Sequence, residues 1–328
     1  MKAIVTENRV KEAKEMRAVY CDTLMELAAE NKDIVVLDAD LMSSMGVAKF
    51  AKEYPDRTFN VGIQEANMIG VAAGLSATGK VPFAHSFGPF ATRRCFDQLF
   101  LSVGYAKNNV RVIGSDPGVT AAFNGGTHMP FEDMGIVRNI PTATILEPVD
   151  STMLKDLLRQ TSKLQGLFYI RLLRKNAIKI YEDGSTFDIG KGVTLKDGKD
   201  VTLIATGIMV EDALTAAEML EKVGVSARVV NIFTLKPIDS ELIVSCAKET
   251  GALVTVENHN IINGLGSAVS EVVVENYPVP VERVGVKDRF GQVGPVEYLK
   301  ETYGLTRDEI CSAALKVIKR KKEVSSNA

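Results

Sequence analysis

The chain has 328 residues, of which 46% are hydrophobic and 24% charged, and its formal net charge is −2. This length suffices for two domains with separate cores, and the near-zero charge gives no indication of a nucleic-acid-binding or membrane-binding surface. No apolar run approaches the roughly 18 residues of a membrane span, and the N-terminus lacks a signal-peptide layout. The four cysteines are far apart without a CxxC pair, so we expect reduced thiols and a cytoplasmic location.

Short apolar runs rich in β-branched residues alternate with longer helical patterns along the chain. In chain order, the predicted strands cover residues 34–38, 81–85, 110–114, 143–146, 168–172, 201–205, 227–232, 252–257 and 281–284. Predicted helices fall between them, among others at 15–30, 66–77, 92–103, 151–161, 210–223 and 240–249. This alternation predicts an α/β protein with two doubly wound, mostly parallel sheets.

Polar, turn-rich segments at 181–186 and 196–199 indicate a domain boundary. We therefore predict domains at 12–185 and 190–320, with tails at 1–11 and 321–328. Ligands of open α/β sheets bind at the carboxyl ends of the strands. In the first domain, the stretches 39–46, 86–90 and 115–128 follow predicted strands, and 62–65 follows the short run Thr58–Val61.

Glu65 opens a helix rich in glycine and alanine, which can approach another backbone closely. A carboxylate in a first helical turn also simply complements the helix dipole, so this position alone does not establish a function. Phe87 and Phe90 follow a predicted strand around Gly-Pro. They can form a wall against a flat ring, or they can be core aromatics.

The glycine-rich stretch 114–130 contains His128 and is a candidate ligand loop, although a lone histidine is equally compatible with a structural role. Candidate anion ligands are Arg17, Ser44, Arg171 and Arg174, because guanidinium groups bind phosphates through forked hydrogen bonds. Each of them, taken singly, also fits a surface charge. The sequence has no Walker loop, GxGxxG, HExxH or magnesium-diphosphate signature.

Taken together and in order, these segments resemble the middle and C-terminal domains of transketolases over about residues 12 to 320. Chains of this length resemble the C-terminal subunit of split transketolases. The resemblance implies a thiamine-diphosphate pyrimidine-binding fold followed by a transketolase C-terminal-like domain. Deoxyxylulose-phosphate synthases and the β subunits of 2-oxoacid dehydrogenases share these two domains.

The resemblance also implies roles for four residues near the cofactor. Glu65 is expected to hydrogen-bond the aminopyrimidine ring, because a carboxyl group in an apolar site can share a proton with a ring nitrogen. Phe90 is expected to stack on that ring with Phe87 beside it, and Asp40 to lie near the cofactor.

For the substrate, the resemblance implies that Arg17, Ser44 and Arg174 bind a phosphate. It also implies that His128 hydrogen-bonds sugar hydroxyls or a developing oxyanion. Two positions depart from the family pattern: Ser115 stands where a histidine is usual, and Asn124 stands where an aspartate is usual. We therefore expect a sugar preference other than the standard pentose phosphates, with a branched, deoxy or sulfonated sugar left open.

The expected function is the transfer of a two-carbon ketol unit from a ketose phosphate to an aldose phosphate. In the family, the magnesium-diphosphate signature belongs to the N-terminal domain. We therefore expect Mg²⁺ and the diphosphate of thiamine diphosphate to be held mainly by a separate N-terminal subunit, in a heterotetramer with two copies of each chain. The helix after Glu65 is expected at the interface.

Three alternatives remain: a 2-oxoacid dehydrogenase β-like subunit, a deoxyxylulose-phosphate synthase-like subunit, and a non-catalytic regulatory subunit of the same fold. The phosphate ligands argue against the first, and the presence of Glu65 and Phe90 argues against the last. For the second domain we expect a role in dimer architecture, with His259 structural.

Overall fold

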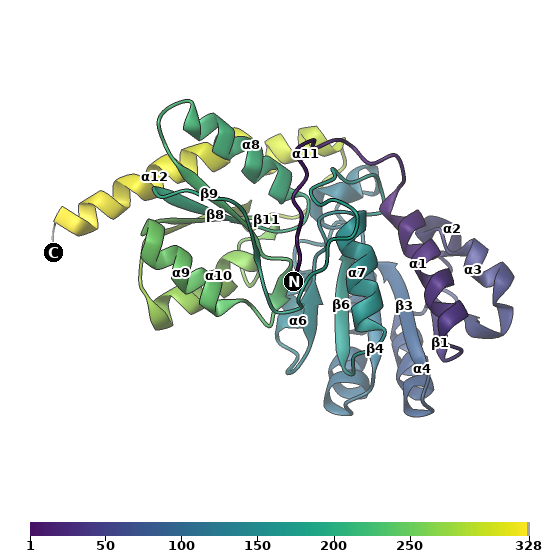
Figure 1. Cartoon of the computed structure of the whole chain (residues 1–328). Helices are drawn as coiled ribbons and strands as arrows, with labels where there is room; N and C mark the ends of the chain where they lie inside the picture. Colours follow the sequence, from purple (N-terminus) through teal and green to yellow (C-terminus); the bar gives the residue numbers. More distant parts are fainter. Residues whose placement is uncertain (327–328) are drawn as a thin grey trace.

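A seven-stranded sheet forms the centre of the first half of the protein (Figure 1). The computed structural model describes the backbone of residues 1–326 and the side chains of residues 1–323. The strand order is β10-β5-β6-β4-β3-β1-β2, and all neighbours are parallel except β10 and β5. The strands are β1 (Ile34–Asp38), β2 (Thr58–Asn60), β3 (Val81–Phe87), β4 (Val110–Ser115), β5 (Thr144–Leu146), β6 (Leu167–Leu172) and β10 (Thr234–Lys236).

Helices cover both faces of this sheet. The helical segments are α1 (Met16–Glu30), α2 (Met42–Met45), α3 (Ala48–Glu53), η1 (Pro55–Arg57), α4 (Glu65–Ala77), α5 (Gly88–Ala91), η2 (Arg93–Cys95), η3 (Gln98–Tyr105), η4 (Gly118–Asn124), α6 (Asp133–Arg138) and α7 (Ser151–Thr161). In β1, Ile34 and Val36 face a core shared with α1 and α7, whereas Val35 and Leu37 face a core shared with α4 and η3. Such a strand is apolar on both sides, as the alternation of its side chains between two covered faces requires.

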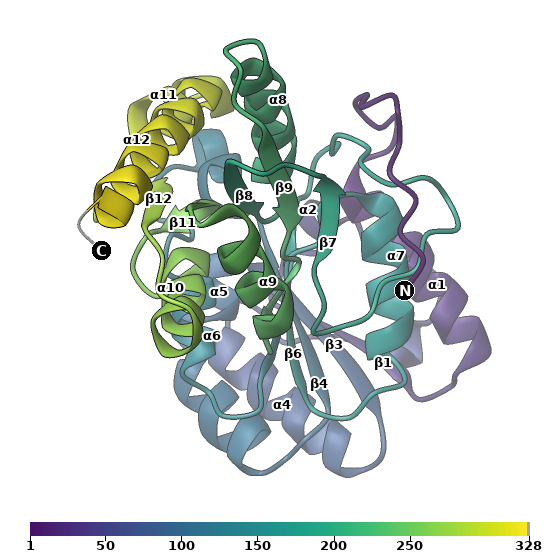
Figure 2. The same ribbon diagram turned by 60° about the vertical axis from the view of Figure 1, so that its left-hand side comes forward.

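The second half contains a five-stranded sheet with the order β12-β11-β8-β9-β7 (Figure 2). Its core is shared with α8 and α12 on one face and with α9 and α10 on the other. The elements are β7 (Val193–Lys196), β8 (Val201–Ala205), α8 (Met209–Glu221), β9 (Ala227–Asn231), α9 (Ser240–Thr250), β11 (Leu253–Asn260), α10 (Leu265–Asn276), β12 (Val281–Val286), α11 (Val296–Tyr303) and α12 (Arg307–Ser326). The predicted α/β fold with two mostly parallel sheets is confirmed, and only β7 is antiparallel in this sheet.

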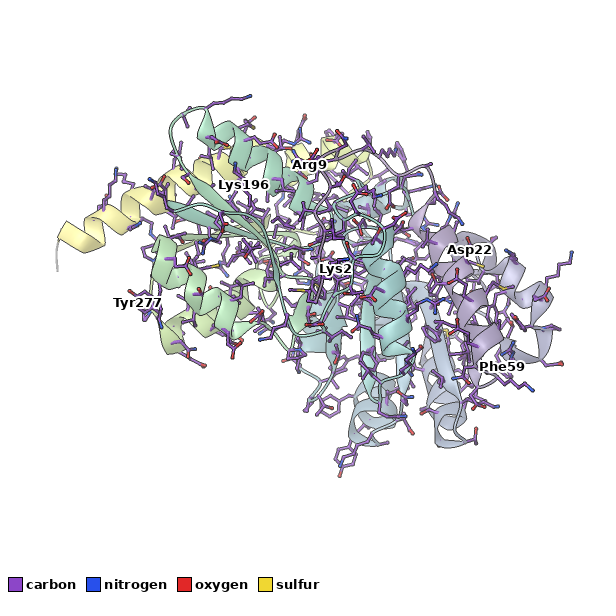
Figure 3. The ribbon with its side chains drawn as sticks, in the orientation of Figure 1. Lys2, Arg9, Asp22, Phe59, Lys196 and Tyr277 are labelled. Atoms are coloured by element: carbon purple, nitrogen blue, oxygen red, sulfur yellow. The ribbon has the colours of Figure 1, made fainter. Side chains whose placement is uncertain are left out.

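The two halves are joined by more than the chain that connects them. β10 comes from the second half yet pairs with β5 of the first sheet. Residues 1–11, which we expected to be a tail, form isolated bridges with residues 178–186. Arg9 then pairs with Glu211 and Glu218 on α8 at 2.7 and 2.5 Å, and Figure 3 shows Arg9 beside that helix. The N-terminal segment therefore lies across the junction, and the domain bounds at 185 and 190 stay a prediction.

The predicted helix at 92–103 is wrong in its form. The structure has the short turn η2 and then the π-helix η3. Thr92 has φ −125° and ψ −79°, outside the helical region, and its hydroxyl donates to the carbonyl of Gly88. This break turns Arg94 toward the end of β3, where it contacts Glu65.

Among the helices of residues 1–326, none is both long enough and apolar enough to cross a membrane.

Candidate active site

Most of the predicted site residues gather at one edge of the first sheet, where its parallel strands end. Phe87 ends β3 and Ser115 ends β4, and the two are register partners; Ser115 is also the partner of Leu172 at the end of β6. Arg174 lies two residues beyond β6, and Glu65 begins the helix whose first turn meets the end of β3. The carboxyl ends of the strands therefore bring together residues that are up to 109 positions apart (174 − 65).

Glu65 is a buried carboxylate with two donors. Its side chain is 1% exposed, Oε1 accepts from the Ser86 hydroxyl at 2.8 Å, and Oε2 pairs with Arg94 at 2.8 Å. The N-terminus of α4 adds a favourable dipole for the negative charge. The expectation of a purely apolar site was wrong, because the chain supplies both a hydroxyl and a guanidinium group here.

An aromatic cluster lies beside this carboxylate. The ring of His128 lies 5.1 Å from that of Phe87 and 5.0 Å from that of Phe90, edge-on to both. The guanidinium group of Arg94 lies over the Phe90 ring at 3.8 Å, so it contacts both the ring and Glu65. Such contacts fix the orientation of the Phe90 ring. Glu65, Phe87, Phe90 and His128, four residues from three chain segments, thus form one site.

The imidazole of His128 is expected to be neutral at physiological pH. Burial lowers its pKa from 6.5, and the nearby Arg94 and Arg174 act in the same direction against Asp116. We predict an NMR titration midpoint below 6.5 for His128, so that any activity requiring the neutral ring is lost only on the acid side. The Phe90→Ala variant opens the cluster to water and should move the midpoint back toward the ordinary value. A midpoint above 6.5 in the unmodified chain contradicts this reading.

Arg174 does not stand free as an anion ligand. Its Nε lies 2.6 Å from Asp116 Oδ2, and its guanidinium group lies 5.0 Å from the centre of the Phe87 ring. Burial raises the pKa of Asp116, and Arg174 opposes that shift. Ser115 is fully buried and donates its hydroxyl to Asp116 at 3.3 Å. This buried hydrogen bond from Ser115 therefore helps to orient the Asp116 carboxylate.

Arg17 and Ser44 lie together, as expected for two ligands of one group. Arg17 donates to the backbone carbonyl of Ser44 at 2.9 Å and pairs with Glu15 at 2.6 Å. Its backbone N–H donates to the carbonyl of Arg174 at 3.4 Å, which brings the start of α1 beside the end of β6. Both predicted arginines thus carry a carboxylate partner from the chain itself.

The last two predicted residues are exposed. Asp40 has a φ of 65°, and its backbone N–H donates to Asn60 Oδ1, which also accepts from Gly62 N–H. Asn60 thereby links the Asp40 turn to the segment that leads into α4. Asn124 is exposed at the end of η4, just before the loop turns at Gly125.

Arg171, another candidate anion ligand from the sequence, has a structural role instead. It is fully buried, and its guanidinium group pairs with Asp133 and with Glu147, at 2.7 Å each. Both forks of the side chain are occupied by these carboxylates and by backbone carbonyls. It is not available to a substrate.

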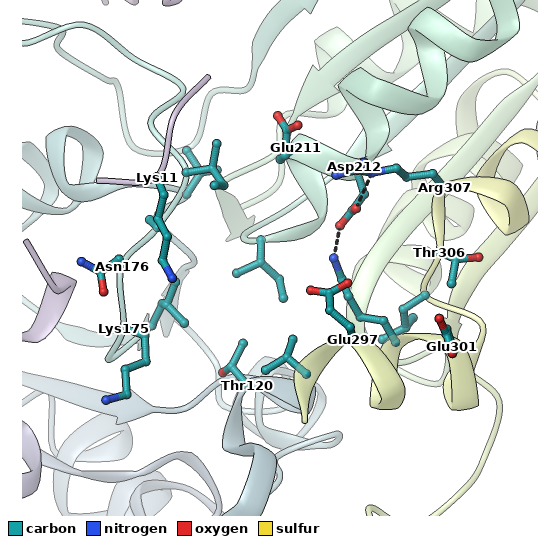
Figure 4. Close-up of a pocket in the computed structure, with 18 of the residues that line it drawn as sticks. Lys11, Thr120, Lys175, Asn176, Glu211, Asp212, Glu297, Glu301, Thr306 and Arg307 are labelled. Atoms are coloured by element: carbon teal, nitrogen blue, oxygen red, sulfur yellow. Dashed lines mark hydrogen bonds and ion pairs between the residues drawn. The ribbon is translucent and has the colours of Figure 1, made fainter. Parts of the chain in front are cut away.

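A cleft of about 720 Å³ lies between the two halves, away from this cluster (Figure 4). Lys11 and Lys175 line one side, and Glu297 and Arg307 line the other, with Thr120 of η4 between them. None of the ten predicted site residues lines it. At the sheet edge, Glu65, Phe87 and Ser115 are buried, whereas Phe90 and His128 are half-buried.

Family models match both halves of the chain. Residues 12–179 match the pyrimidine-binding domain of transketolase, and residues 190–310 match the transketolase C-terminal domain. The chain belongs to the transketolase family. The family predicted from the ordered motifs is thereby confirmed.

Relatives of this transketolase-family chain include subunits of similar length. It is 53% identical over 306 residues to a 6-deoxy-6-sulfo-D-fructose transketolase subunit from Clostridium sp. (strain MSTE9), covering 93% of this chain and 95% of that subunit. It is 36% identical over 305 residues to one of the subunits of an apulose-4-phosphate transketolase from Phocaeicola vulgatus, covering 93% and 97%. A solved split gene transketolase, described as an inactive beta4 tetramer, superposes with a TM-score of 0.87 at 43% identity, covering 94% of this chain and all of that one. The chain thus matches nearly the whole length of these relatives, which are named as subunits or split-gene forms of transketolases.

Three residues that contact the predicted site residues were not predicted from the sequence: Arg94, Asp116 and Asn60. In the sequence, Arg94 stands out only as one of two adjacent arginines near the start of the predicted helix at 92–103. Asp116 is the next residue after Ser115 in the sequence, but its pairing with Arg174 depends on the register of β4 and β6.

Proposed function

We propose that this chain provides the pyrimidine-binding and sugar-binding face of a thiamine-diphosphate-dependent transketolase that is active only with a separate N-terminal subunit. The observation that carries the proposal is the buried Glu65 carboxylate beside the Phe90 ring. A carboxylate of this kind can share a proton with a ring nitrogen, and an adjacent aromatic face can stack on the same ring.

The residues present fit the aminopyrimidine half of thiamine diphosphate. Glu65 would accept or share the proton at the ring nitrogen, Ser86 would hold that carboxylate in place, and Phe90 would stack on the ring. Bound in this way, the coenzyme supplies the electron sink for cleavage of a carbon–carbon bond. Among the described side chains of residues 1–323, no cluster of three or more His, Cys, Asp or Glu groups is placed to hold a metal. From the resemblance to transketolases, we propose that the partner holds Mg²⁺ and the diphosphate, in a complex with two copies of each chain.

The sugar would be bound by His128, Arg174 and Arg17. A neutral imidazole at the site can donate to a substrate hydroxyl or to a developing negative charge on oxygen. The arginines would bind the anionic end of the sugar through forked hydrogen bonds. These groups would orient the substrate and exclude water, while Glu65 would accept or share the proton at the nitrogen of the aminopyrimidine ring.

We propose a 6-deoxy-6-sulfo ketose as the donor. The Clostridium relative at 53% identity is named for such a sugar. Because Arg17 and Arg174 each already carry a carboxylate partner, the site offers less uncompensated positive charge than two free arginines would. A sulfonate carries a single charge at neutral pH, whereas a phosphate monoester carries about −1.5 to −2.

The test is co-expression with an N-terminal transketolase-like subunit, followed by assays with thiamine diphosphate and Mg²⁺. Two donors that differ only at carbon 6 are compared: 6-deoxy-6-sulfofructose and fructose 6-phosphate. We expect kcat/KM to favour the sulfonate about tenfold or more. Equal values would overturn the assignment of the donor, and failure of the complex to turn over either sugar or other ketoses would overturn the proposed function itself.

A further inference from the structure

The loop that carries His128 is held at both ends by the second half of the protein. At its start, the Val119 N–H donates to Asn258 Oδ1 at 2.9 Å, and Asn258 Nδ2 donates to the Pro117 carbonyl at 2.8 Å. At its end, the Asn260 N–H donates to the Phe131 carbonyl at 2.9 Å. Both asparagines belong to β11, so one strand end fixes the two ends of the loop at 117–131.

The loop backbone follows the shape of Asn258 closely. Gly118 has a φ of 46°, and a Cβ atom at that position would fall on Asn258 Oδ1. Asn258 is itself fully buried, so neither its acceptor nor its donor has water as an alternative partner. The pair of hydrogen bonds therefore specifies one backbone path through residues 117–119.

Asn258 is in turn held by the buried Arg171. The guanidinium group of Arg171 donates to the Asn258 carbonyl at 3.2 Å and to the Pro130 carbonyl at 3.0 Å. Arg171 also pairs with Asp133, at the start of the helix that follows the loop. One charged network, without solvent access, thus joins the strand end of the second domain to both ends of the loop.

The middle of the loop rests on the second half as well. A Cβ atom on Gly126 would meet the backbone oxygen of Gly291, and one on Gly125 would meet the side chain of Val293 at 2.7 Å. His128 lies two residues after Gly126, and its ring contacts those of Phe87 and Phe90. The loop at 117–131 therefore packs between the second domain and the aromatic rings of Phe87 and Phe90.

We propose that Asn258 is a positioning residue for the sugar-binding loop, and that holding His128 in place is a task of the second domain in ketol transfer. The kinetic part rests on the proposed function, whereas the loop contacts stand without it. Asn258 acts through Pro117 and Val119 and touches neither His128 nor the ring-binding residues Glu65 and Phe90. Loss of the Asn258 side chain should therefore weaken sugar binding and leave the affinity for the coenzyme unchanged.

The experiment uses the assembled complex with Asn258→Ala and, separately, with Gly118→Ala. In the second variant, the added Cβ atom clashes with Asn258 Oδ1. The matched control is Asn231→Ala, since Asn231 is also fully buried in the second half but donates to the Tyr181 hydroxyl at 3.0 Å. We measure KM and kcat for the sugars, the Kd of thiamine diphosphate, and amide hydrogen exchange of the peptide 115–131.

Both loop variants should raise KM for the sugars about tenfold while the Kd of thiamine diphosphate changes less than about twofold. Exchange of the Val119 N–H should become about tenfold faster or more, because this buried N–H loses its acceptor, Asn258 Oδ1. Unchanged exchange in this peptide, or an equal rise in KM for Asn231→Ala, would overturn the proposal. Hydrogen exchange tests the loop even if the unmodified complex turns over no sugar, so failure of the proposed function is seen separately.

Discussion

Replacing Glu65 with glutamine is expected to lower kcat of the assembled complex by about 10²- to 10⁴-fold, the range for loss of a positioned proton-transfer group. Glutamine has nearly the same shape but cannot carry the negative charge or share a proton. The variant should still assemble with its partner, because Glu65 is 1% exposed and contacts Ser86 and Arg94 of its own chain. The measurement is steady-state turnover together with the Kd of thiamine diphosphate.

The matched control for this variant is Glu249→Gln. Glu249 also pairs with an arginine, Arg228, at 2.6 Å, but it lies on α9 of the second half. Its loss should change kcat less than about twofold, as expected for an exposed ion pair far from the site. If Glu65→Gln retains the kcat of the unmodified complex, the chain is a regulatory subunit that has kept the fold without the chemistry.

The second large effect is expected on stability, from replacing Arg171 with methionine. Removing one partner of a buried ion pair leaves an uncompensated charge and typically costs about 3–5 kcal/mol. Arg171 serves two buried carboxylates, those of Asp133 and Glu147, and both would lose their partner together. We expect the free energy of unfolding in urea to fall by this amount, with a lower denaturation midpoint.

Arg159→Met provides the comparison for Arg171. Arg159 pairs with Glu26 and Glu30 between α7 and α1, but its side chain is 32% exposed and those glutamates are more so. Exposed pairs contribute about 0–1 kcal/mol, so this variant should be nearly as stable as the unmodified chain. Equal decreases in the free energy of unfolding for the two variants would show that the buried network of Arg171, Asp133 and Glu147 is not what joins the halves.

The fold could be read from the sequence because its central strands are apolar on both faces and its helices separate them regularly. Ile34 to Leu37 is such a run, and each of its residues is buried. The strands that escaped prediction are short and lie at sheet edges. β10 has three residues, and its pairing with β5 depends on where the second half packs rather than on its own composition.

The site was predictable to the extent that motifs at strand ends meet at one edge of a parallel sheet. The gathering of Phe87, Phe90 and His128 follows from that rule and from the resemblance to transketolases. What the sequence could not provide is how charges pair. Whether Arg174 faces Asp116 or solvent is decided by strand register, and whether Arg94 reaches Glu65 is decided by a backbone break at Thr92.

We propose that half of a coenzyme site lies on this chain and the other half on a different polypeptide. The most direct measurement is calorimetric titration of thiamine diphosphate with Mg²⁺ into the purified chain, into the N-terminal subunit, and into the complex, with turnover of ketose donors followed in each. Tight binding and turnover are predicted for the complex only. Tight binding and turnover by this chain without a second protein would contradict the account.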